Sequence, residues 1–199
     1  MGFSWFKDKG DEILNLDYPI NENSVVLDIG AHRGKWSLDM SNKHRCCIYA
    51  FEPVKKFYQE AVDVLRGHKN VKLFNYGAWV MSTSLHVGVF GVSSSIYLDG
   101  KKEVCEFKDI GEILKMCGPV DVMSVNIEGA EYDLLDAMIG RELLFQVRFL
   151  NVQFHTNKGI NNIYERYESI KNALESTHNL RWRYPFVWES WGPKYSNLF

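Results

Sequence analysis

The sequence of 199 residues lacks long apolar runs, lacks cysteine pairs at metal-binding spacing and lacks an excess of charge of one sign. Its longest apolar runs, such as residues 46–51, are far shorter than the roughly 20 residues that a membrane-spanning helix needs. The 23 basic and 25 acidic residues give a formal net charge of −2, so no global field attracts a polyanion. We therefore expect neither a membrane span nor a nucleic-acid partner.

The four cysteines form no CxxC pair and lie in or beside apolar stretches, where a free thiol behaves as a small hydrophobic side chain. The N-terminus has no basic segment followed by an apolar one, so no cleaved secretory signal is indicated. Met1-Gly2 begins a myristoylation pattern, but Phe6 stands where that pattern has Ser or Thr. We expect a cytoplasmic protein with reduced cysteines and no cluster of Cys and His metal ligands.

Strand-like and helix-like segments alternate along the chain without repeats or linkers, which indicates an α/β fold with a mostly parallel sheet and helices on both faces. Buried strands are predicted at residues 25–29, 46–51, 71–76, 121–127 and 146–154. Amphipathic helices are predicted from Val54 to Leu65, from Glu131 to Ile139 and from Ile160 to Leu174, because their apolar residues recur at steps of three and four.

Two regions depart from this alternation. Short alternating pieces with glycine-rich breaks predict a small antiparallel excursion between Trp79 and Phe107. Within it, residues 93–95 are expected to turn the chain, and the alternative is a polar loop that closes over a ligand. Alternating aromatic residues from Trp182 to Trp188 predict an antiparallel C-terminal hairpin packed on the core, whereas Trp191 and Tyr195 are expected to be freer.

Ligands in such sheets bind at the carboxyl ends of strands. The first strand end is the turn from Asp28 to Gly34, in which Gly30 permits close approach of a ligand and Gly34 lets a helix begin. Glu52 follows Gly30 by 22 residues, near the offset of about 20 at which an acidic side chain binds ribose hydroxyls. The alternative is that the glycines turn the chain and Glu52 caps a helix, but their combination favours a nucleoside site.

This turn does not match two other phosphate-binding patterns. A P-loop has four residues between its glycines and Ser or Thr after its Lys, whereas here three residues intervene and Trp36 follows Lys35. A dinucleotide turn has glycine at the position of His32, so little room is left for a pyrophosphate. The mismatch to the P-loop means that an ATPase is not expected. A nicotinamide-dependent oxidoreductase shares the first turn and Glu52 and stays as the alternative enzyme class.

Two further strand ends carry polar side chains. Asn126 and Glu128 follow one strand and precede a helix whose start favours the acidic Glu131. His155 follows the next strand, at the end of the run Gln153-Phe154-His155. The structural alternatives are a solvated helix start for the carboxylates and a strand cap for the lone histidine.

The blocks at residues 26–37, 50–53 and 121–131 resemble the FkbM family of S-adenosylmethionine-dependent O-methyltransferases. The first turn is common to many Rossmann-like methyltransferases, but the combination of Phe-Glu-Pro with a later Ile-Glu-Gly-Ala-Glu is a much more specific pattern. The resemblance implies a single Rossmann-like class I methyltransferase domain over residues 1–199. Residues 1–23 are then an N-terminal extension or helix, and residues 24–199 are the core.

The resemblance also implies S-adenosylmethionine as the cofactor, with S-adenosylhomocysteine as the product. The implied cofactor-binding residues are Asp28, Gly30, Ala31 and Gly34 at the methionine part, Ser37 at its carboxylate, Glu52 at the ribose, and Gly77, Ala78 and Trp79 near the adenine, together with His32 in the first turn. His32 stands where the family usually has Asn.

An alcohol acceptor benefits from a positioned base, and His155 is the first candidate, since an ordinary imidazole is largely neutral near pH 7. Glu128 is expected to orient the imidazole or to act itself, ahead of Glu131, and Asn126 to hydrogen-bond the acceptor. Asn126 replaces a frequent Asp, and a neutral amide argues against a base or a strong divalent-metal site there. No metal ligand is assigned, and a divalent-metal requirement stays open.

The acceptor implied by the resemblance is a sugar hydroxyl in a glycan or glycoside, such as a deoxyhexose of the rhamnose type. Fusion to, or association with, glycosyltransferases fits such a substrate. The third hypothesis is a degenerate domain that binds the cofactor without catalysis, because Asn126 stands in place of Asp.

Overall fold

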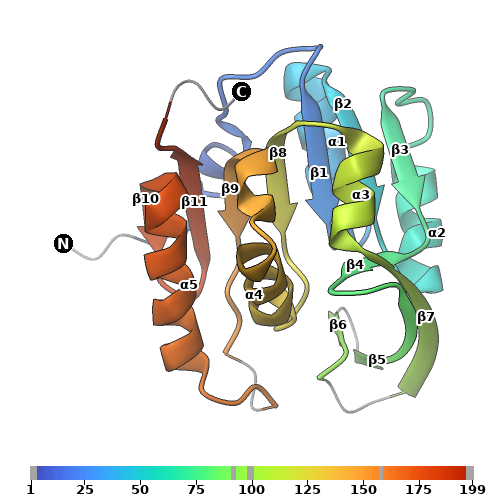
Figure 1. Ribbon diagram of the computed structural model, residues 1–199. Coiled ribbons are helices and arrows are strands. Elements are labelled where there is room, and N and C mark those ends of the chain that lie inside the picture. Colours follow the sequence, from blue (N-terminus) through green and yellow to red (C-terminus); the bar gives the residue numbers. More distant parts are fainter. Residues whose placement is uncertain (1–3, 91–92, 98–100, 157–158, 196–199) are drawn as a thin grey trace.

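The computed structural model describes residues 4–90, 93–97, 101–156 and 159–195, and a seven-stranded sheet forms its centre (Figure 1). The strand order is β10-β11-β9-β8-β1-β2-β3. The strands are β1 (Val25–Ile29), β2 (Cys47–Phe51), β3 (Val71–Phe74), β8 (Val120–Val125), β9 (Val147–Val152), β10 (His178–Tyr184) and β11 (Trp188–Pro193). β11 is antiparallel to both neighbours, and the other adjacent strands are parallel. The predicted fold class is confirmed.

Helices cover both faces of this sheet. They are α1 (Lys35–His44), α2 (Lys55–Val64), α3 (Ile110–Cys117), α4 (Glu131–Gly140) and α5 (Ile163–Thr177), with short 3-10 helices at Leu14–Leu16 and Leu143–Gln146. Leu27 belongs to the hydrophobic cluster that includes α4 and α5, whereas its neighbour Val26 belongs to the cluster on the α1 side. Strands buried on both faces are apolar at consecutive positions, which is why they were visible as continuous runs. No helix in the described ranges has the length and apolar character needed to cross a membrane.

A second sheet lies next to the carboxyl ends of the main strands (Figure 1). Its strands are β4 (Gly77–Trp79), β5 (Thr83–Phe90), β6 (Ser93–Ser95) and β7 (Lys101–Asp109), in the order β4-β7-β5-β6. β5 is antiparallel to β6 and β7, while β4 pairs with β7 in parallel. The antiparallel excursion is confirmed, but the expected turn at residues 93–95 is wrong, because these residues pair with β5 as an edge strand.

The hairpin of β10 and β11 packs against the N-terminal segment, residues 4–23. This segment consists of turns and the 3-10 helix at Leu14–Leu16. Trp5 is buried and its ring centroid lies 5.2–6.4 Å from the rings of Trp182, Tyr184 and Trp188. Tyr195 is exposed as expected, but Trp191 is fully buried, so the expectation that it is free is wrong.

Candidate active site

The glycine turn after β1 closes against the end of β8. Gly30 has φ +90°, and a Cβ atom there would lie 2.0 Å from the main-chain oxygen of Asn126. The Asn126 N–H in turn donates to the carbonyl of Ile29 (3.0 Å), and the N–H groups of Gly30 and Ala31 donate to that of Phe51. Only glycine fits at position 30, and the ends of β1, β2 and β8 are held together there.

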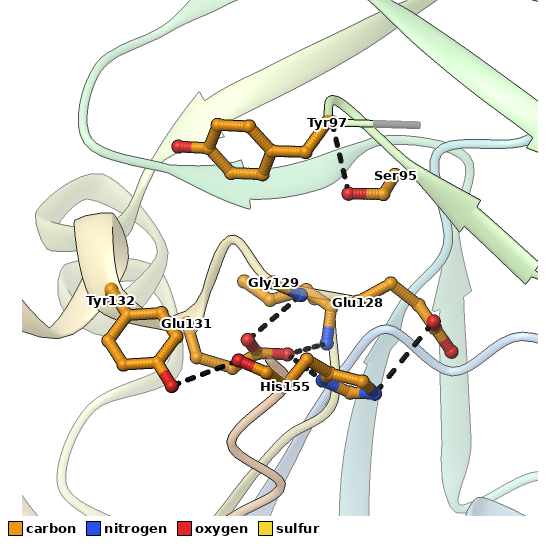
Figure 2. A network of polar contacts seen from close by, with 8 residues as sticks. Ser95, Tyr97, Glu128, Gly129, Glu131, Tyr132 and His155 are labelled. Carbon is orange, nitrogen blue, oxygen red and sulfur yellow. Dashed lines mark hydrogen bonds and ion pairs between the residues drawn. The ribbon is translucent and has the colours of Figure 1, made fainter. Parts of the chain in front are cut away.

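A cavity, here called cavity A, opens between these strand ends and the second sheet. Its walls include Gly30, Glu52 and Asn126 from the main sheet, Gly77, Ala78 and Trp79 from β4, and Val87, Ser95, Ile96 and Phe107 from the rest of the second sheet. The Tyr97 N–H donates to Ser95 Oγ (3.1 Å), and the Tyr97 hydroxyl donates to Asp133 of α4. Figure 2 shows Ser95 and Tyr97 on one side of the site, across from Glu128 and Gly129.

Glu52 is the buried acid of cavity A, with only 3% of its surface exposed. Its carboxylate accepts the N–H of His32 on Oε2 and the N–H of Val54 on Oε1, each at 2.8 Å. Burial raises the pKa of Glu52 to about 7, although the two N–H groups lower it in part. The side chain is thus fixed by the main chain on both sides while it still lines the cavity.

Asp28 and Ser37 form a buried pair beneath the glycine turn. The Ser37 hydroxyl donates to Asp28 Oδ2 (2.6 Å), and burial raises the pKa of Asp28 to about 6. Asp28 lines a second cavity, whereas Ser37 is fully buried and lines neither. Ser37 therefore positions Asp28 and does not reach a ligand directly.

His32 and Gly34 both have left-handed backbone conformations in this turn. The His32 ring packs on Phe57 with centroids 4.2 Å apart, and His32 lines both cavities. A Cβ atom on Gly34 would lie 3.0–3.2 Å from Leu65 and Ala61. Gly34 thus lets α1 begin close to α2 and lies outside both cavities.

The second cavity, here called cavity B, lies on the other side of Gly30, His32 and Asn126, which line both cavities. Its other walls include Asp28 of β1 and Ala31 after it, Ser124 and Gln153 from the ends of β8 and β9, Trp188 of β11, and Asp11, Glu12 and Asn15 of the N-terminal segment. Asn126 Oδ1 is buried and has no hydrogen-bond partner among the described residues.

A network around Glu131 forms the side of the site at the ends of β8 and β9 (Figure 2). Glu131 is fully buried, and its carboxylate accepts the N–H groups of Ile127 and Gly129 and the Nδ1 of His155, each at 2.9 Å. His155 Nε2 lies 3.8 Å from Glu128 Oε2. Glu131, and not the expected Glu128, is therefore the residue that orients the imidazole.

The carboxylates set the protonation of His155. Burial lowers the pKa of His155, but the hydrogen bond to Glu131 and the charges of Glu131 and Glu128 outweigh burial and raise it above its ordinary value. For Glu128, in contrast, burial itself raises the pKa of the carboxyl group. The imidazole is thus a stronger base than a free histidine. Its main chain is anchored too, because the Tyr132 hydroxyl donates to the His155 carbonyl (2.9 Å).

The structure brings most of the predicted site residues together. Glu52, Gly77, Ala78, Trp79, Asn126 and Glu128 line cavity A, and His155 lies behind Glu128 and lines neither cavity. The sequence reasoning did not assign Asn15, Gln153, Ile96 or Phe107. Only Gln153 had a usable signal, because it lies near the end of the strand predicted at residues 146–154, two residues before His155. In the described ranges, no three His, Cys, Asp or Glu side chains are grouped as metal ligands.

Neither protein-family models nor curated proteins match the sequence, but solved structures share its fold. An rRNA methylase from Streptococcus thermophilus aligns with a TM-score of 0.59 at 12% identity, over 97% of this chain and 98% of that one. SMU.1697c, a candidate methyltransferase from Streptococcus mutans in complex with SAH, aligns with 0.56 at 12% identity, over 97% and 99%. TrmK from M. capricolum, also with S-adenosylhomocysteine (SAH), aligns with 0.51 at 9% identity, over 96% and 69%. The chain has the Rossmann-like α/β fold of these methyltransferases.

Proposed function

We propose that this protein is an S-adenosylmethionine-dependent methyltransferase. The observation that carries the proposal is Glu52, a buried carboxylate at the end of β2 that two main-chain N–H groups hold on the wall of cavity A. An acid at this position in Rossmann-like sheets receives the two hydroxyls of a ribose. The fold that the chain shares with methyltransferases solved with SAH supports the same conclusion.

The residues of both cavities fit this cofactor. Gly77, Ala78 and Trp79 of β4 offer main chain and an apolar surface for adenine beyond Glu52. Asp28 and Ala31 line cavity B, where the methionine part would lie. The bound cofactor supplies an electrophilic methyl group.

The acceptor that we propose is a hydroxyl, in keeping with the resemblance of three sequence blocks to the FkbM O-methyltransferases and with the strengthened base His155. Methyl transfer is an in-line displacement, so the main task of the site is to hold the acceptor oxygen in line with the methyl group. Because His155 lines neither cavity, the acceptor proton would reach its Nε2 by way of Glu128, whose carboxylate lines cavity A 3.8 Å from Nε2, while Nδ1 is held by Glu131. Asn126 would hydrogen-bond the acceptor. A sugar hydroxyl is the substrate that the resemblance favours.

Two alternatives are less well supported. An oxidoreductase would need room for a pyrophosphate at His32. The His32 ring, however, packs on Phe57, and the main-chain N–H of His32 is already bonded to Glu52. A degenerate cofactor-binding domain would not need an imidazole held by a fully buried carboxylate.

The experiment that tests the proposal is calorimetry with S-adenosylhomocysteine, followed by turnover assays on a panel of glycosides, including rhamnosides. We expect saturable binding and the appearance of S-adenosylhomocysteine from S-adenosylmethionine, with the gain of one methyl group on the acceptor by mass spectrometry. No affinity for either form of the cofactor in folded protein would refute the proposal. Binding without turnover on any acceptor would favour the degenerate domain.

A further inference from the structure

Cavity B is larger than the amino-acid part of the cofactor needs. Its volume of about 530 Å³ lies in the range of about 300–1,000 Å³ that holds whole drug-sized ligands. Asp28 and Ala31 line its inner part, beside the glycine turn, whereas Gln153, Trp188 and the N-terminal segment line the rest. If the cofactor binds as proposed above, the outer part has room for the acceptor next to Asn126.

The charges on the wall of cavity B are mainly negative. Four carboxylates and two cationic side chains line it: Asp11, Glu12, Asp28, Asp39, Arg33 and Lys35. Both cations already have a carboxylate partner, because Arg33 pairs with Glu60 (2.5 Å) and Lys35 with Asp39. Within the described residues, Asp11 and Glu12 have no ion-pair partner. A phosphate or carboxylate entering the outer cavity would meet net repulsion.

The neutral polar groups of cavity B include one hydrogen-bond acceptor without a partner among the described residues. Asn126 Oδ1 is buried without a partner in the described chain. Asn15 is buried and fixed, since its side-chain oxygen accepts from Asn151 (3.1 Å) and its carbonyl from the Trp36 indole (3.2 Å). Both Asn15 oxygens are therefore occupied, whereas Asn126 Oδ1 and the carboxylates of Asp11 and Glu12 suit a ligand that brings donors, such as hydroxyl or ammonium groups. Trp188 adds a flat apolar surface on the same wall.

We propose that cavity B is the acceptor site and that its N-terminal wall selects a hydroxyl-rich acceptor without phosphate or carboxylate groups near the methylated atom. Asp11 and Glu12 are then specificity-determining residues. The inference rests on the proposed methyltransferase function, and it separates this protein from the rRNA methylase of the same fold, because an RNA backbone carries one negative charge for each nucleotide.

The test uses the full chain saturated with S-adenosylhomocysteine and ligand-observed saturation-transfer NMR. The probes are methyl glycosides of hexoses and deoxyhexoses, an amino sugar, the 6-phosphates of the same hexoses, and a short RNA. We expect transfer to the uncharged and amino sugars and at least a five-fold weaker signal for the phosphate esters and the RNA. Glu12→Lys should reduce the sugar signal at least three-fold. Glu22→Lys, which makes the same charge change on an exposed residue outside cavity B, should leave it unchanged.

Three results would overturn the inference: equal or stronger transfer to the phosphate esters or the RNA, no transfer to any uncharged sugar, or equal signals from Glu12→Lys and Glu22→Lys. Calorimetry with S-adenosylhomocysteine on the same samples keeps the two proposals apart. If S-adenosylhomocysteine binds normally and any of these three results is obtained, only the acceptor assignment is wrong. If the product does not bind, the proposed function fails and the acceptor site fails with it.

Discussion

Glu131 and His155 come from different elements, α4 and the segment after β9, and are joined by a hydrogen bond of 2.9 Å between Oε1 and Nδ1. The same carboxylate holds the loop that carries Glu128. Replacing Glu131 with Gln removes the charge that raises the pKa of His155. Because the base must be unprotonated to act, we expect the acidic limb of the pH profile of kcat to move to lower pH, with a lower maximum rate.

The control for this variant is Glu165→Gln, which changes another glutamate in the first turn of a helix, but on the exposed side of α5. Its pH profile should match that of the unchanged protein. An unshifted acidic limb in Glu131→Gln, with its fold intact by circular dichroism, would show that the bond to Glu131 does not set the basicity of His155.

His155→Ala tests the base itself. The imidazole lines neither cavity, so its removal should leave the Kd for S-adenosylhomocysteine within two-fold of the unchanged value. Turnover should fall by roughly 10²–10⁴, the usual contribution of a positioned general base. Calorimetry and turnover measured on one preparation check both parts. Unchanged turnover would remove His155 from the mechanism.

Glu52→Gln should weaken binding of S-adenosylhomocysteine at least ten-fold at pH 8, because a neutral amide accepts hydrogen bonds from the ribose less strongly than a carboxylate. Burial raises the pKa of Glu52 to about 7, so the unchanged protein should also gain affinity as pH rises from 6 to 8 and then level off. The variant should lack this gain. Calorimetry at several pH values measures both effects. The control is Glu175→Gln, at an exposed position of α5.

The same raised pKa predicts how the stability of the ligand-free protein depends on pH. Because the folded state holds the proton of Glu52 more tightly than the unfolded state, this contribution to stability is complete below about pH 4.5 and is lost as pH rises through about 7. Relative to Glu52→Gln, the unchanged protein should lose up to about 3 kcal/mol between these limits. Urea unfolding of both proteins at pH 5 and pH 8 measures the difference. A constant difference would mean that Glu52 ionises at its ordinary pKa in the folded state.

The sequence predicted those parts of the site that depend on local pattern. Strands buried on both faces leave continuous apolar runs, and Glu52 follows Gly30 at a distance set by one strand-helix-strand unit. Ser95 at cavity A was expected only as the alternative to a turn, since its edge-strand pairing with β5 leaves no local pattern. Asn15 could not be predicted, because it reaches cavity B through the separate N-terminal turns. Sequence spacing did not distinguish Glu128 from Glu131 either. The left-handed conformations of Glu128 and Gly129 turn the loop around the Glu131 carboxylate.

Gly30→Ala tests whether the turn after β1 depends on close contact with β8, and Gly67→Ala is its matched control. The two glycines have almost the same φ, +90° and +91°, so alanine meets a left-handed strain of roughly 1–2 kcal/mol at both positions. At Gly67 nothing lies within 4 Å of the added Cβ, whereas at Gly30 it would lie 2.0 Å from the Asn126 carbonyl oxygen.

We therefore expect Gly67→Ala to lower the free energy of unfolding by that strain alone and to bind S-adenosylhomocysteine normally. Gly30→Ala should cost clearly more stability and lose binding, since the Asn126 main chain must move away from the point where the two cavities meet. Equal unfolding free energies and equal affinities in the two variants would contradict the close approach of β1 and β8 on which the site is built.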